Sequence, residues 1–155
     1  MLADFQQALA DLVAAPDHCQ SIRDGDLHEL DRYDLTMTER GRLVAIALHR
    51  GMAANCAIYR SNRLTPIVIN LPDTCATLGS QLRPVIDRFW ATHPTEHFVH
   101  FLVEAERFVA FLEEMRDEDF GNDAEALRIA VAREGAVVRS GLAATTSSRR
   151  RGLTG

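Results

Sequence analysis

Apolar residues recur three and four positions apart along most of the chain, which is the spacing of amphipathic helices. No stretch alternates apolar and polar residues over the length of a strand. The helices predicted from this pattern span approximately residues 2–13, 37–50, 52–71, 73–78, 84–93, 96–116 and 123–134. The sequence therefore predicts an all-α fold, a single helical bundle, and leaves open a small C-terminal sheet element at Val137 and Val138.

Several residues indicate where these helices begin and end. Thr36 and Glu39 have the spacing of a capping box, so a helix is expected to start after Thr36. Pro66 predicts either a kink or a fresh helix start within residues 52–71. Pro16 is expected to stop the first helix, and the polar residues 17–34 to form an irregular connection with at most a short turn. The other expected helix ends and caps are Gly79, Thr95 and Asn122.

The length and the cysteine content limit the class of protein. A chain of 155 residues is long enough for one domain with a buried core, so we expect a helical domain over residues 1–140. Residues 141–155 are small, polar and basic, which predicts a flexible or disordered tail. The three cysteines are an odd number without a C-x-x-C pair, and no apolar run is long enough to cross a membrane. These features favour a cytoplasmic protein with no membrane association.

The charged residues exclude some chemistry. All 17 residues in the Lys+Arg count are arginine, so neither a lysine Schiff base nor a P-loop lysine exists. Three of these arginines are Arg149, Arg150 and Arg151, so residues 1–148 carry 14 arginines against 22 acidic residues, a net charge of −8. A body with that charge repels a phosphate backbone, which makes nucleic acid an unexpected partner.

One candidate metal site follows from the spacing of two histidines and an acid. His97, His100 and Glu104 fall on one side of a predicted helix and offer two imidazoles and a carboxylate, a donor set that suits iron or zinc. The same spacing is common on the solvated edge of an amphipathic helix, and a closed site needs a further ligand. We therefore expect neither a metal nor another cofactor in this chain.

The cysteines and serines offer no convincing nucleophile. Cys56 and Cys75 lie among apolar positions, so they are expected to be small buried hydrophobic residues. Cys19 follows His18, but adjacency in sequence does not make a catalytic pair. No serine has the context of a nucleophile elbow. We expect no catalytic residue and no enzymatic activity of the chain alone.

Arginine and aromatic residues form the most informative cluster. Arginine guanidinium groups and aromatic rings are enriched in protein interfaces, so a cluster of them suits docking onto a carboxylate-bearing partner. The alternative is that the arginines pair with acids of the same chain, Asp87 or Glu104, and tie helices together, and that the Phe-Trp pair is core. The candidate partner-interface residues are Tyr59, Arg60, Asn62, Arg63, Phe89, Trp90 and His93.

The order and spacing of several short motifs resemble the core pattern of the MbnC-like family, a bacterial family first labelled as DNA-binding. The similarity runs from about Leu2 to Leu112. The motifs are Cys56–Asn62, Arg63-Leu64, Leu71-Pro72, Leu78-Gly79, Phe89-Trp90, His93-Pro94, and Phe108 with Phe111-Leu112. After Leu112 the chain departs from the family, whose members continue into a region with sheet character that can engage a peptide by strand addition.

The resemblance implies a function in the biosynthesis of ribosomally made, methanobactin-type peptides. Such proteins are non-catalytic partner subunits of multinuclear iron oxidases, with which they form heterodimers, and the iron is held by the oxidase. The complex binds a precursor peptide, and the oxidase converts a cysteine to an oxazolone with an adjacent thioamide. The partner subunit helps to recognise the leader of the peptide. The alternatives left open are a DNA-binding transcriptional regulator and a small helical metal-binding protein.

Overall fold

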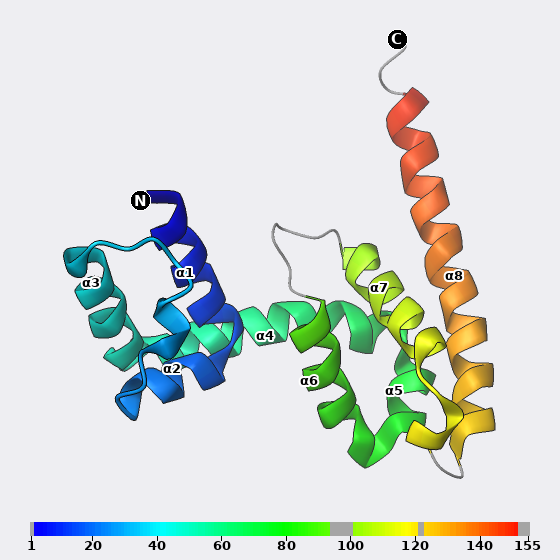
Figure 1. The fold of residues 1–155 in the computed structure, drawn as a ribbon. Coiled ribbons are helices and arrows are strands. Elements are labelled where there is room, and N and C mark those ends of the chain that lie inside the picture. The colour runs from blue at the N-terminus through cyan, green and yellow to red at the C-terminus, as the bar shows by residue number, and fades with distance from the viewer. Residues whose placement is uncertain (1, 94–100, 121–122, 152–155) are drawn as a thin grey trace. The chain divides into compact units, whose positions relative to one another are not determined.

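The computed structural model describes residues 2–93, 101–120 and 123–151, with only the backbone for residues 146–151. Within these ranges the chain forms helices and no strand, so the predicted all-α fold is confirmed. In chain order the elements are α1 (Leu2–Ala14), α2 (Pro16–Arg23), η1 (His28–Leu30), α3 (Met37–Leu48), α4 (Gly51–Asn70), α5 (Pro72–Leu78), η2 (Gly79–Gln81), α6 (Leu82–Thr92), α7 (Phe101–Glu114), η3 (Asp117–Asp119) and α8 (Ala124–Arg151) (Figure 1).

The chain divides within α4 into two compact units. The N-terminal unit comprises Met1–Asn62 and the C-terminal unit Arg63–Gly155, and each has its own hydrophobic core. The sequence predicted one domain over residues 1–140 with one core. A helix of 20 residues is about 30 Å long. It is long enough to contribute Met52 and Cys56 to one core and Ile67 to the other.

In the N-terminal unit, α1, α2, α3 and the first part of α4 surround a core that contains Leu12, Leu30 and Leu43. The expected capping box is confirmed: the Thr36 hydroxyl accepts a hydrogen bond from the Glu39 amide, and the Glu39 carboxylate accepts one from the Thr36 amide.

The irregular connection predicted for residues 17–34 is wrong in its first part, because α2 occupies Pro16–Arg23. Pro16 ends α1 as expected, but it also begins the next helix, since proline suits a first turn that needs no amide donor. Cys19 and Ile22 are buried, which anchors this helix to the core. The expected short turn is η1, at His28–Leu30.

The helix predicted for residues 52–71 is confirmed as α4, and Pro66 does not begin a new one. Proline removes one amide donor from a helix interior. One turn after Pro66, the Asn70 side chain donates a hydrogen bond of 2.7 Å to the Pro66 carbonyl. Pro66 and its neighbour Ile67 are buried, so packing against the core favours continuation of the helix.

In the C-terminal unit, α7 and α8 pack closely against each other. A Cβ atom added to Gly135 would lie 2.8 Å from Cγ1 of Val109, so the glycine permits the close approach of the two helices. The sequence predicted a helix ending near Glu134 and a flexible tail from residue 141, but α8 continues to Arg151. The alanine-rich composition without proline favours helix over this whole stretch. Val138 is a buried core residue of α8, not part of a sheet element.

Charged side chains of α8 close the ends of two other helices. The Glu134 carboxylate is buried and accepts hydrogen bonds from the amides of Asp73 (2.8 Å) and Thr74 (2.9 Å) at the start of α5. Arg128 donates to the carbonyls of Leu112 (3.1 Å) and Glu113 (3.3 Å) at the end of α7. The far end of α5 closes at Gly79, whose φ of +49° is a conformation that glycine adopts readily, as the sequence predicted.

Candidate functional site

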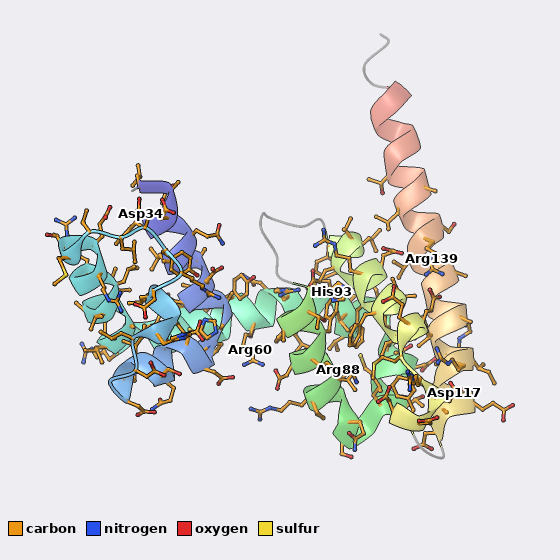
Figure 2. All side chains as sticks on the ribbon, in the orientation of Figure 1. Asp34, Arg60, Arg88, His93, Asp117 and Arg139 are labelled. Atoms are coloured by element: carbon orange, nitrogen blue, oxygen red, sulfur yellow. The ribbon has the colours of Figure 1, made fainter. Side chains whose placement is uncertain are left out.

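The cluster of arginine and aromatic residues in the C-terminal unit is organised around Arg63. Its Nε donates a hydrogen bond of 2.7 Å to Oε1 of Glu104 on α7, and its Nη2 donates one of 3.0 Å to the carbonyl of His93. Arg63 is 7% exposed and Glu104 is 3% exposed. His93 directly follows α6 and is labelled in Figure 2. Arg63 therefore connects α4 to α7 and satisfies a carbonyl at the C-terminal end of α6.

Aromatic rings surround the Arg63 guanidinium. Its central carbon lies 5.3 Å from the centre of the Trp90 ring and 5.6 Å from that of Phe89, close enough for cation–π attraction. Phe89 itself is fully buried against Phe108, at 5.2 Å between ring centres, and against His93, at 5.1 Å. The cluster therefore belongs to the hydrophobic core of the C-terminal unit and includes one buried ion pair, Arg63 with Glu104.

The structure separates the seven predicted interface residues by burial. Arg63 and Phe89 are buried and offer little surface to a partner, and an interface role for the seven residues stays a prediction. For Arg63, the alternative drawn from the sequence, pairing with Glu104, is the one observed. The physical reason is helical spacing, because Arg63 falls on the same side of α4 as the buried Ile67. The partly or fully exposed members are Tyr59, Arg60, Asn62, Trp90 and His93.

Only one of the three residues of the candidate metal site, Glu104, lies within the described residues. His97 and His100 lie outside the described residues, whereas the Glu104 carboxylate binds Arg63 through one oxygen. Its other oxygen, Oε2, is buried and accepts no hydrogen bond from any described residue. Across the described parts of the chain, no three His, Cys, Asp or Glu side chains are grouped so that they could hold a metal ion.

The solvent-facing side of α4 is the feature that the sequence analysis missed. Each residue that α4 exposes is uncharged, and its two arginines lie elsewhere: Arg60 is half-buried and Arg63 is buried. The exposed residues are Ala53, Ala54, Asn55, Ala57, Ile58, Ser61 and Asn62 in the N-terminal unit, and Thr65, Val68 and Ile69 in the C-terminal unit. We call the three exposed residues of the C-terminal unit, Thr65, Val68 and Ile69, the α4 face. The signal that could have revealed it is the run of uncharged residues from Gly51 to Asn70, interrupted only by these two arginines.

A pocket of about 430 Å³ opens in the C-terminal unit beside η3. Charged side chains of both signs line it, with Arg88 3.5 Å from Asp119. The Asp119 carboxylate also accepts a hydrogen bond of 3.2 Å from the Arg116 amide. The lining residues are Arg88, Phe111, Glu114, Met115, Arg116 and Asp119. These groups could hold a polar ligand, but they include no activated nucleophile.

Comparison with known proteins identifies no relative: no family model, curated protein or solved structure matches the chain. Within the described residues, no helix combines the length and the hydropathy needed to cross a membrane.

Proposed function

We propose that this chain is a non-catalytic subunit that binds an iron-dependent, peptide-modifying oxidase through the α4 face and helps it to recognise a ribosomally made precursor peptide. The observation that carries the docking step is the absence of charge from every exposed residue of α4. The resemblance of the chain to MbnC-like subunits supports the identity of the partner. The modification is then of the type that converts a cysteine to an oxazolone and a thioamide, and the iron is held by the oxidase.

The composition of the α4 face is what the buried centre of a protein interface requires. Charged residues are depleted there because each must lose its hydration when a partner covers it. One quarter of this chain is charged, yet α4 contains only two charged residues, the half-buried Arg60 and the buried Arg63. Ile69, in the C-terminal unit, is 63% exposed and offers most of its side chain to a partner. Val68, in the same unit, adds a further large apolar side chain.

Arg63 contributes to this function indirectly. Its hydrogen bond to Glu104 and its contact with the His93 carbonyl hold the C-terminal part of α4 against α7 and the end of α6. A rigidly held helix presents its exposed side chains at lower entropic cost when a partner binds. Arg63 is therefore a positioning residue of the α4 face, whereas Val68 and Ile69 are the contact residues.

The test is co-purification with a multinuclear iron oxidase, using Ile69→Asp. A buried isoleucine is worth about 1.5–3 kcal/mol and a buried, unpaired carboxylate adds a further cost, so we expect binding to weaken by more than about tenfold. Ile129→Asp on α8 is the matched control, because Ile129 is the same residue type with nearly the same exposure, 61%. It should leave binding unchanged.

Equal co-purification of wild type and Ile69→Asp would contradict docking through the α4 face. Loss of binding in both variants would also contradict it, because the effect would then not depend on position. Helical content measured by circular dichroism confirms that each variant is folded. If no iron oxidase binds the wild-type chain, the assignment of the partner fails as well.

A further inference from the structure

Two cysteine thiols meet inside the N-terminal unit. Cys19 lies on α2 and Cys56 on α4, and both side chains are buried in the same hydrophobic cluster. Both thiols donate to a single acceptor, the carbonyl of Leu12, with Sγ–O distances of 3.2 Å for Cys19 and 3.6 Å for Cys56. Neither is part of a disulfide. Two sulfur atoms are therefore brought together from positions 37 residues apart.

The proton affinity of Cys19 agrees with this arrangement. The pKa of its thiol is raised to about 11, with burial as the largest cause and the neighbouring Cys56 thiol as a further one. The third cysteine, Cys75, lies in the C-terminal unit, where burial and the Glu134 carboxylate raise its pKa to about 11. Cys75 is therefore comparable in burial and acidity but has no thiol beside it.

We propose that Cys19 and Cys56 form an oxidisable dithiol, which hydrogen peroxide converts to an intramolecular disulfide that links α2 to α4. In the first step one thiol loses its proton and attacks a peroxide oxygen, giving a sulfenic acid and one water. In the second step the other sulfur attacks the sulfenic sulfur, its proton leaves with the hydroxyl group, and a second water forms. The two sulfurs lose two electrons in total, and peroxide takes them up.

The apolar surroundings favour this product over the other chemistry open to two thiols. A soft metal ion such as Cu(I) bound to two thiolates leaves a net negative charge, which the Leu12 and Leu43 side chains of the cluster cannot solvate. A disulfide is uncharged and releases both thiol protons. Burial also slows the first step, since it disfavours the reactive thiolate. A small, uncharged oxidant is therefore the reagent that can reach the pair in the folded chain.

The experiment treats the full-length chain with hydrogen peroxide in native buffer, then unfolds it and alkylates the remaining thiols for peptide mass spectrometry. We expect a cross-linked peptide pair containing Cys19 and Cys56, lighter by two hydrogen atoms than the reduced pair, while Cys75 remains available to alkylation. We also expect the oxidised chain to melt several degrees higher, because the cross-link restricts the unfolded state. Both effects should disappear on reduction with dithiothreitol.

Matched variants locate the reaction. Cys75→Ala should form the cross-link to the wild-type extent, whereas Cys19→Ala and Cys56→Ala should not form it. Because the wild-type peptide map identifies the linked residues directly, the result does not depend on the folding of either variant. The proposal is overturned if Cys19 and Cys56 remain alkylatable after oxidation, if they end only as separate sulfinic acids, or if Cys75 enters a disulfide to the same extent.

Discussion

Replacement of Arg63 by methionine tests whether the buried ion pair stabilises the C-terminal unit. The change removes the hydrogen bond of 2.7 Å to Glu104, the one of 3.0 Å to the His93 carbonyl, and the contact with Trp90. It leaves the Glu104 carboxylate 3% exposed and without its cation. Removing one partner of a buried pair costs about 3–5 kcal/mol, because the remaining charge stays desolvated. We expect a loss of that size in the free energy of unfolding.

The chain supplies both a probe and a control for this measurement. Trp90 is the only tryptophan, and its ring adjoins the Arg63 guanidinium, so its fluorescence follows unfolding of the C-terminal unit during a urea titration. Arg133→Met is the matched control: Arg133 pairs with Asp73, but both side chains are 61% exposed. An exposed ion pair contributes about 0–1 kcal/mol, so the control should change little.

A double variant distinguishes the stability lost through the unpaired Glu104 charge from the stability lost through poorer packing. Arg63→Met combined with Glu104→Leu removes the unpaired carboxylate, and apolar replacement of a whole buried pair is often close to neutral. The double variant should therefore be more stable than Arg63→Met alone. The reasoning is refuted if Arg63→Met costs no more than Arg133→Met, or if adding Glu104→Leu lowers the stability further.

Two further predictions concern helix packing and alkaline stability. Gly41→Ala in α3 should raise the free energy of unfolding by about 0.5–1 kcal/mol, because alanine favours the helix and its Cβ would meet no atom within 4 Å. Gly135→Ala in α8 should lower the free energy of unfolding, because its Cβ would clash with Val109 on α7. Urea titrations of both variants test these opposite signs. The pKa of Tyr33 is raised from 10.0 to about 12 by burial and by its hydrogen bond to the Asp11 carboxylate. The neutral Tyr33 hydroxyl therefore stabilises the folded state below pH 10, and this contribution is lost as the pH rises to about 12. In Tyr33→Phe the melting temperature should fall less steeply across that pH interval than in the wild type. An unchanged slope in Tyr33→Phe would assign the alkaline loss to other groups.

Local sequence signals predict the helices where the determining residues are close together in the chain. The capping box of Thr36 and Glu39 needs residues three positions apart, and it is present. The helix α2 escapes prediction because Pro16 is typical of a helix end, although proline also favours the first turn of a helix. The length of α8 escapes prediction because the small, polar residues after Gly141 resemble a linker in composition.

The candidate sites depend on contacts between distant residues, which a single sequence does not define. Arg63 and Glu104 are 41 positions apart, so the sequence alone offers their pairing only as one alternative beside an interface role, whereas the structure shows the pairing directly. The meeting of Cys19 and Cys56 depends on the placement of α2, a helix that the sequence did not predict. The α4 face required knowledge of which side of the helix is buried.

The contact between Glu134 and the start of α5 has a consequence for the order of events during synthesis. The helix α5 has only seven residues, too few to be stable by itself, and the partner of its first amides lies about 60 positions further along the chain. Until α8 has been translated, only water can accept hydrogen bonds from the amides of Asp73 and Thr74 in that first turn. The C-terminal unit is therefore expected to acquire its native structure only after α8 has emerged, even though α5 itself is made much earlier.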